Sequence, residues 1–449
     1  MKMLRPMPFL PLLPLAAAIA LALSLPASAQ SLVELHAAAR TFDAAYQSAK
    51  SQFDASIAKA DQSKAGILPS ANLSAGASRT NLVSSTPSTP EVERTFGANT
   101  ATLSASQPLY RPANWIGYAQ GKKGVDVAQA QLVAAEQDLI IRVGTAYFDV
   151  LAAQDSLTFV KAQKAAVAEQ LASAKRNFEV GTSTITDTRE AQARYDLVIA
   201  QEIAAENDHR IKRIALDQLV GKTDANPKPL ALPVNLPALQ PAEVDAWVQQ
   251  AQAAHPGIAQ SRLALEVAKL ETEKAKTGHL PTLDATGSYT ATQNRGGSST
   301  GATDSRSNVA SIGLSFNLPL FAGFATQNRI KETLALEDKA SSDLDATRRA
   351  VAQGTRTAYF GVLSGQGQVK ALEAAEASSQ SALDATKLGY QVGVRINIDV
   401  LNSQSLLFQT KRDLAKARYD VLLTGLKLRQ ANGTLKADDL GPVNALLAP

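Results

Sequence analysis

Residues 180–187 read VGTSTITD, and 212 positions later residues 392–399 read VGVRINID. The same interval separates Ala146-Tyr147-Phe148 from Ala358-Tyr359-Phe360. A constant interval over so much of the chain indicates an internal duplication. We therefore expect two similar halves, and in an oligomer such halves can form one ring of doubled pseudo-symmetry.

The domain organisation follows from this duplication. We predict repeat 1 over residues 30–221 and repeat 2 over residues 241–433, with a Pro-rich linker at 222–240 and a C-terminal segment at 434–449. Each repeat is expected to contain a helix, which in repeat 1 spans 31–66, then a β-hairpin, a long helix and a return helix. The expected ranges are about 70–110 and 282–320 for the hairpins, 113–179 and 324–391 for the long helices, and 187–221 and 398–433 for the return helices.

Residues 1–29 have the form of a signal peptide. Lys2 and Arg5 precede an apolar run that ends at Ala27-Ser28-Ala29, a small-residue cleavage signal. A single-pass anchor is the alternative, but prolines interrupt the run and its small-residue end favours cleavage. We therefore expect an exported chain.

The composition of the chain argues against several classes of function. Cysteine is absent, so the chain has no disulfide framework, no thiolate metal site and no lipidated cysteine. Removing Lys2 and Arg5 from the 45 basic residues leaves 43 against 41 acidic residues, a balance that gives no argument for nucleic acid as a partner. The histidines lack metal-ligand spacing and no P-loop is present, so we expect no metal, no cofactor and no enzymatic activity.

Each repeat contains two segments in which apolar and polar residues alternate. In repeat 2 the apolar positions are Leu283, Ala285, Tyr289 and Ala291 in one segment and Ile312, Leu314, Phe316 and Leu318 in the next. This period of two predicts strands with one apolar face, although a soluble sandwich would show it too. Polar loops are expected at 84–93 and 295–306, at the far ends of the hairpins. No segment after the signal is apolar enough for a transmembrane helix, so a membrane-spanning role would require a closed β-barrel.

A coiled-coil pattern follows each hairpin. The apolar residues between Val125 and Phe178, and again between Ile330 and Tyr390, are separated by sums of three and four residues. At about 1.5 Å per residue, a helix over 113–179 would be on the order of 100 Å long, which is longer than a compact domain needs. Each long helix should end at a glycine turn, and Asp187 is the expected N-cap of the first return helix.

Four strands per chain cannot close a barrel, because the smallest membrane barrels have about eight strands. We therefore expect strands shared between subunits, with polar faces toward a lumen and apolar faces toward lipid. Candidates for an interfacial aromatic girdle are Tyr110, Trp115, Tyr289 and Phe321, with packing in a core as the alternative. Strand–helix junctions are expected at Pro69, Pro108, Pro281 and Pro319.

With these features the chain resembles a TolC-family outer-membrane channel, also called an outer membrane factor. The resemblance covers essentially the whole mature sequence. It is most specific at residues 180–187 with 193–196, and at 389–401 with 417–419 and 433–435. It implies a homotrimer in which four membrane β-strands per chain form a shared 12-stranded barrel, continued by a long α-helical coiled-coil tunnel in the periplasm.

The implied function is a trimeric exit duct in the outer membrane of a Gram-negative bacterium, extending into the periplasm and serving type I protein secretion, multidrug efflux or both. The implied partners are a periplasmic adaptor (membrane fusion) protein, an inner-membrane ABC or RND-type transporter, and outer-membrane lipid. The alternatives are a periplasmic adaptor or a secreted coiled-coil adhesin without a pore. An adaptor usually needs a compact β domain, and an adhesin needs no repeated amphipathic hairpin.

The resemblance also implies a gate at the periplasmic tip. Tyr390 and Arg395 are expected to bond to Thr186 and Asp187 and so to hold the second coiled coil inward, until a docking partner shifts a two-state tip. The alternative is a helix cap at Asp187 and a solvated turn charge at Arg395. Tip turns and partner docking are expected at Gly181 and Gly393.

Asp399 resembles an acidic constriction residue of the same family. Three copies would form a carboxylate ring that favours cations. The family pattern has a second acidic residue at the position of Asn402, so we expect weaker cation selectivity and weaker divalent block here. The alternative is again a helix cap, because Asp399 lies 212 residues after Asp187.

Overall fold

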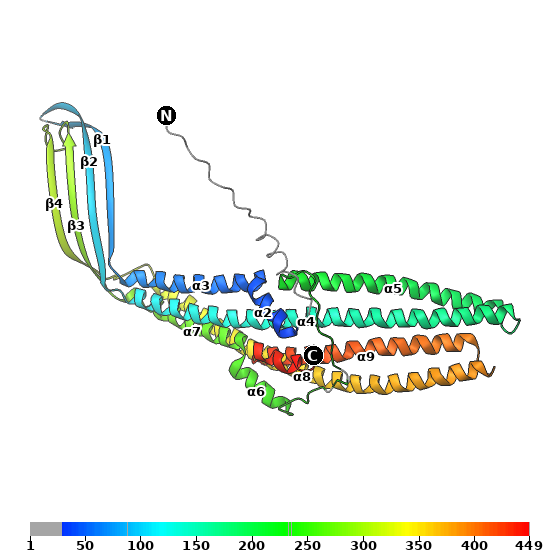
Figure 1. Ribbon diagram of the computed structural model, residues 1–449. Helices are drawn as coiled ribbons and strands as arrows, with labels where there is room; N and C mark the ends of the chain where they lie inside the picture. Colours follow the sequence, from blue (N-terminus) through cyan, green and yellow to red (C-terminus); the bar gives the residue numbers. More distant parts are fainter. Residues whose placement is uncertain (1–28, 88, 232, 235, 449) are drawn as a thin grey trace, which may run out of the picture. The chain divides into compact units, whose positions relative to one another are not determined.

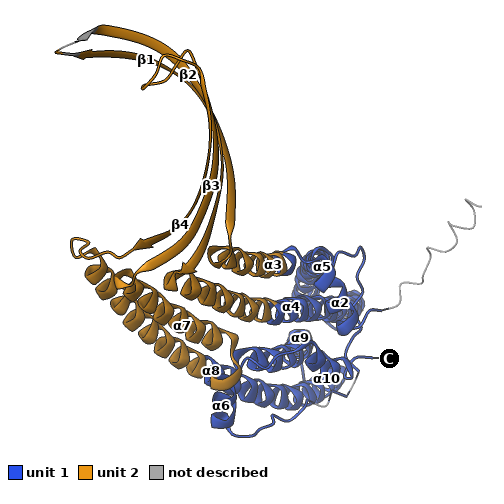
Figure 2. Ribbon diagram, turned by 90° about the vertical axis from the view of Figure 1, so that its left-hand side faces the viewer, with its two compact units in different colours: residues 1–47, 136–251, 354–449 blue, residues 48–135, 252–353 orange. Residues whose placement is uncertain are grey.

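The computed structural model describes residues 29–87, 89–231, 233–234 and 236–448 (Figure 1). The signal peptide expected over residues 1–29 lies, except for its last residue, outside the described residues. The chain divides into two compact units (Figure 2). Unit 1 is formed by residues 1–47, 136–251 and 354–449, and unit 2 by residues 48–135 and 252–353.

Unit 2 contains one antiparallel sheet made from both repeats. Its strands are β1 (Ser70–Thr86), β2 (Thr89–Tyr110), β3 (Thr282–Arg295) and β4 (Ser305–Asn317), in the order β1-β2-β3-β4. Strands β2 and β3 come from different repeats and pair directly, with Leu103 opposite Tyr289. The duplicated hairpins therefore join into a single four-stranded sheet.

The register of the sheet gathers apolar side chains on one face. Leu73, Leu103, Tyr289 and Ala310 lie opposite one another across the four strands, and Ser74, Thr102, Thr290 and Val309 form the next row. Because successive side chains point to opposite faces, the first row belongs to the apolar face and the second to the largely polar one. Ile312 is 96% exposed on the apolar face, so a single chain leaves that face bare.

The loop expected at 84–93 is wrong, because the strands of the first hairpin extend into this polar stretch. Strand β1 continues to Thr86 and β2 begins at Thr89, with Val83 opposite Glu93. The Asn81 side-chain amide donates a hydrogen bond of 2.9 Å to the Glu93 carboxylate, so polar side chains support the pairing instead of ending it. The second hairpin does turn at 296–304, between β3 and β4.

Two helices are much longer than the others. Helices α4 (Pro112–Glu179) and α8 (Ala325–Gln391) have 68 and 67 residues, and each contributes to both units. The other helices are α2 (Leu32–Phe42), α3 (Ala44–Lys64), α5 (Ile185–Val220), α6 (Val244–Ala254), α7 (Pro256–Lys276), α9 (Asn397–Ala431) and α10 (Leu440–Asn444), with short 3₁₀ turns at η1 (Ala65–Ile67), η2 (Thr277–His279) and η3 (Ala437–Asp439).

The first helix of each repeat is broken at the same place in the duplication. Asp43 separates α2 from α3, and His255, 212 residues later, separates α6 from α7. The Asp43 carboxylate accepts a hydrogen bond from the Tyr46 amide, and the His255 ring nitrogen accepts one from the Gly257 amide. A side-chain cap that satisfies the first free amides starts a new helix. The uninterrupted helix expected over 31–66 is therefore wrong.

A duplicated tyrosine fastens irregular segments to unit 1. The hydroxyl proton of the fully buried Tyr147 is shared between the carbonyls of Lys228 at 2.9 Å and Gln30 at 3.3 Å. Its counterpart Tyr359 donates to the Ala242 carbonyl. Each hydroxyl satisfies a backbone acceptor of a segment that has little regular structure of its own.

The four prolines expected at strand–helix junctions lie in or beside strands of unit 2. Pro69 and Pro281 come directly before β1 and β3, and Pro319 follows the end of β4 at Asn317. Pro108 lies inside β2, where the register with β3 shifts. Proline has no amide hydrogen to donate, so it is tolerated at a strand's first residue or at such an irregularity.

The aromatic residues proposed for an interfacial girdle all lie in unit 2 and are exposed in a single chain: Tyr110, Trp115, Tyr289 and Phe321. Packing in a core, which was the alternative, does not occur within one chain. The girdle itself stays a prediction.

Candidate functional site at the helix turns

Two glycine turns reverse the chain within unit 1. One joins α4 to α5 through residues 180–184, and the other joins α8 to α9 through residues 392–396 (Figure 1). Gly181 and Gly393 have φ of 78° and 81°, and a Cβ atom added at either would meet no atom within 4 Å. The need for glycine is therefore conformational, since the left-handed region penalises other residues.

Asp187 closes the N-terminus of α5 from the third position of the helix. The helix cap is Thr184, so the expectation that Asp187 is the N-cap is wrong. The Asp187 carboxylate accepts hydrogen bonds from the Thr184 amide at 3.0 Å and from the hydroxyls of Ser183 and Thr184 at 2.8 Å. Partial burial raises the pKa of Asp187, but these hydrogen bonds outweigh it, and the net effect is a lowered pKa.

The other predicted gate residues make different contacts from those expected. The Tyr390 hydroxyl accepts a hydrogen bond of 3.1 Å from the Asn177 side chain of α4. Arg395 forms an ion pair with Asp399, with 3.6 Å between nitrogen and oxygen. Thr186 is exposed in the first turn of α5. Within the described part of one chain, no hydrogen bond or ion pair joins Tyr390 or Arg395 to Thr186 or Asp187.

The two turns define two helix pairs, α4 with α5 and α8 with α9. A buried asparagine, which the sequence analysis missed, joins these two pairs. Asn397 is 1% exposed at the start of α9. Its side-chain oxygen accepts a hydrogen bond from Gln170 of α4, and its side-chain nitrogen donates one of 3.3 Å to the Asp187 carbonyl of α5. One amide therefore ties both helices of the first pair to the second pair. A sequence signal exists, since Asn397, Leu401 and Gln404 follow the four-and-three spacing of a buried seam.

Further polar contacts continue this connection along α9. The Arg412 guanidinium donates to the Gln163 side chain at 3.2 Å, and Arg194 donates to Asn402 at 2.9 Å. Burial lowers the pKa of Arg412. The Arg194–Asn402 contact is exposed, whereas Gln163 is buried, and a polar pair set in an apolar seam fixes the register of the helices. The apolar cluster of this seam consists of Val160, Val167, Leu171, Ala174, Ala191, Val198 and Leu401.

Asp399 lies in the first turn of α9, with its side chain 34% exposed. The cap residue of this helix is Ile396, which offers no side-chain hydrogen bond. A carboxylate in a first turn also interacts favourably with the helix dipole. Asp399 is therefore not the helix cap that was expected as its alternative role. Its carboxylate is a negative charge in the first turn of α9.

The described residues contain no group of three or more His, Cys, Asp or Glu side chains arranged to hold a metal ion. Among the helices that the structure describes, none combines the length and the apolar character needed to cross a membrane.

Comparison with known proteins gives matches along both repeats. A profile of the family described as outer membrane efflux protein matches residues 31–222 and 247–434. The outer membrane protein TolC of Vibrio cholerae is 34% identical over 435 residues, which are 97% of this chain and 98% of the relative. The alkaline protease secretion protein AprF of Pseudomonas aeruginosa is 32% identical over 355 residues, 79% of this chain and 73% of the relative.

Solved structures share the fold. The CmeC outer membrane channel of Campylobacter jejuni superimposes with a TM-score of 0.77 at 18% sequence identity, covering 92% of this chain and 88% of that one. The expected combination of long helices with a membrane-type four-stranded sheet is confirmed by this likeness and by the family match.

Proposed function

The chain belongs to the outer membrane efflux protein family, and on that premise we propose that three copies form the outer-membrane exit duct of a tripartite export system. The observation that carries the proposal is the family match over residues 31–222 and 247–434, which includes both hairpins and both pairs of long helices. The protein is placed in the outer membrane of a Gram-negative bacterium, with its helices in the periplasm.

The bare apolar face of the sheet supports a shared barrel. From Leu283 to Ala291 this face runs over eight residue steps of β3, or about 27 Å along the strand. At the strand tilt of about 40° found in membrane barrels, this length gives a band about 21 Å tall, which is close to the height of about 25 Å that such barrels have. Four strands from each of three chains would close such a barrel, with the row of Ser74, Thr102 and Thr290 toward the lumen.

The two glycine turns would form the periplasmic entrance. Asn397, Tyr390 and Arg194 hold the second helix pair against the first inside each chain. A partner with more favourable contacts to the separated pairs would shift the tip toward an open state. We therefore assign the tip to docking by a periplasmic adaptor and an inner-membrane ABC or RND-type transporter, which supplies the energy.

We infer the class of cargo from the names of the relatives and of the family. AprF is named for alkaline protease secretion, and the family is named for efflux. We infer that the duct serves type I protein secretion, multidrug efflux or both. We assign no catalytic step to the chain, and the Thr186, Asp187, Tyr390 and Arg395 set is proposed as the gate.

Reconstitution tests the proposed duct. Detergent-extracted protein is expected to behave as a trimer in light scattering and to add step-like conductance to planar bilayers. A monomer that adds no conductance would instead support a periplasmic adaptor or an adhesin. Comparing secreted proteins with drug sensitivity after gene deletion separates the two cargo classes.

Asp399→Ala is expected to reduce cation preference. A carboxylate about 4 Å from a passing ion contributes about 1 kcal/mol in a water-like dielectric, so the preference should fall about fivefold. The reversal potential across a salt gradient measures it. The matched control is Asp413→Ala, which removes an exposed carboxylate elsewhere on α9. Equal reversal potentials in wild type and Asp399→Ala would leave only the helix-dipole role.

A further inference from the structure

Three arginines lie on the apolar face of the sheet, at its loop end. Residues two apart on a strand share a face, so the rows beyond Leu73 and Tyr289 continue the apolar face. One such row consists of Ala77, Asn99, Gln293 and Arg306, and the next, farther from the helices, contains Arg79, Gly97 and Arg295. The apolar band therefore ends in a cationic rim, defined as Arg79, Arg295 and Arg306.

None of the rim arginines is engaged within one chain. All three are exposed, and in the described part of the chain none donates a hydrogen bond or forms an ion pair. Three carboxylates lie toward the same end of the hairpins: Asp304 accepts a hydrogen bond from the Gly296 amide, Glu93 accepts one from Asn81, and Glu91 is exposed. The donors of the three rim guanidiniums are unused, and with Arg94 this end of the hairpins has four arginines against three carboxylates, a net charge of +1.

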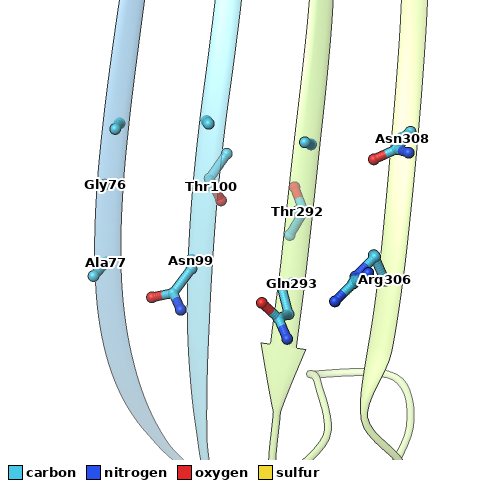
Figure 3. Close-up of a pocket in the computed structure, with 11 residues that line it drawn as sticks. Gly76, Ala77, Asn99, Thr100, Thr292, Gln293, Arg306 and Asn308 are labelled. Atoms are coloured by element: carbon cyan, nitrogen blue, oxygen red, sulfur yellow. The ribbon is translucent and has the colours of Figure 1, made fainter.

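A hollow of about 530 Å³ lies beside this rim (Figure 3). Its floor is formed by small residues of neighbouring strands, and its polar edge by Asn99, Gln293, Arg306 and Asn308. Larger apolar side chains follow in the next row of this face toward the helices, at Leu73, Leu103 and Tyr289. The lining spans three successive rows, of which the middle one, Gly76, Thr100 and Thr292, belongs to the polar face and the other two to the apolar face. The two apolar-face rows place polar donors next to apolar surface.

We propose that this rim binds the phosphate groups of a phosphorylated glycolipid of the outer leaflet, of the lipid A class, whose acyl chains lie along the apolar band. The proposal rests on the proposed function, because the barrel puts this face toward lipid and the loop end toward the outside. A guanidinium pairs bidentately with phosphate, and its planar donors suit an interfacial site. The adjoining apolar band distinguishes a lipid from free phosphate, which would gain nothing from it.

Binding of lipid A to the detergent-solubilised trimer tests the proposal. Native mass spectrometry and a titration with bisphosphorylated lipid A would compare wild type with the triple variant Arg79→Gln, Arg295→Gln, Arg306→Gln. We expect affinity to fall at least about tenfold in the variant, because each charge near the surface contributes to binding an anionic lipid. The charge-matched control replaces Lys331, Arg349 and Lys370, all exposed on α8, by glutamine and should bind as wild type does.

Two further arms identify the ligand chemistry. Dephosphorylated lipid A should bind the wild type as weakly as bisphosphorylated lipid A binds the triple variant, and inorganic phosphate should not compete at millimolar concentration. Equal affinity of wild type and triple variant, or equal affinity for both lipids, would overturn the proposal. Conductance of the same trimers in bilayers without the glycolipid tests the duct separately, so failure of one is distinguishable from failure of the other.

Discussion

Single-channel conductance in planar bilayers is expected to rise when Asn397 is replaced by alanine. The substitution leaves the Gln170 amide and the Asp187 carbonyl without the partner they have between the two helix pairs. An unsatisfied buried polar group costs about 1–3 kcal/mol, and such a cost shifts a two-state equilibrium by about 5- to 150-fold. Because the contact exists only while the pairs are together, the cost falls on the closed tip.

Two further substitutions at the tip are also expected to raise single-channel conductance. Tyr390→Phe removes one hydrogen bond, worth about 1 kcal/mol, and should raise conductance less than Asn397→Ala. Arg395→Ser should also raise it, through the contacts proposed for Arg395 in the closed trimer. The control is Asn207→Ala, which changes an exposed asparagine on α5. Unchanged conductance of the Asn397→Ala, Tyr390→Phe double variant in intact trimers would contradict the gate assignment.

The periodicities of the sequence are enough to predict the fold class. Alternation at Ile312, Leu314 and Phe316 predicts an apolar sheet face, and these side chains do lie on one bare face. The pattern is informative because the side chains of a strand repeat every two residues, whatever covers the face. The loop expected at 84–93 is wrong because this stretch pairs across the two strands, with Ser84 opposite Val92 and Thr86 opposite Thr89, which composition alone does not reveal.

The tip is harder to predict, because its residues act through long-range pairing. The sequence places Asp187 just after a glycine turn, but the cap at Thr184 depends on which hydroxyl reaches the free amides. Asn397 stands between two isoleucines, and its polar side chain obscures its place in the buried seam. Its partners Gln170 and Asp187 are each more than 200 residues away in sequence. The predicted gate set itself remains a proposal, since its expected contacts are not made within one chain.

Asp43→Ala is expected to destabilise helix α2, at the start of unit 1. Arg142 binds the Asp43 carboxylate bidentately, at 2.7 and 2.9 Å, and the same carboxylate caps α3 through the Tyr46 amide. The Asp43 side chain is 9% exposed, so its loss leaves a partly buried arginine with one carboxylate fewer. Losing the pair and the cap together should cost about 3 kcal/mol. That corresponds to about a 100-fold faster amide hydrogen exchange in α2, measured by mass spectrometry on the solubilised trimer.

The same ion pair sets how α2 responds to acid. The hydrogen bonds from Arg142 lower the pKa of Asp43 below its ordinary value of 3.8. A lowered folded-state pKa means that the stabilisation is complete above the ordinary value and is lost as the pH falls through the folded-state pKa. Wild-type exchange in α2 should therefore approach that of Asp43→Ala only in strong acid.

The second partner of Arg142 and the second repeat supply the controls for this response. Asp138→Ala removes the exposed second partner of Arg142 and should change exchange little, because exposed pairs contribute little to stability. Repeat 2 has Gly354 at the position of Arg142 and His255 at that of Asp43, so α6 lacks the ion pair. The cap at this break is lost when the His255 ring is protonated, and burial lowers the pKa of that ring, so the α6–α7 break should respond to acid at a milder pH than α2 does. Parallel loss of protection in α2 and α6 would show that acid disrupts the trimer as a whole and not this ion pair.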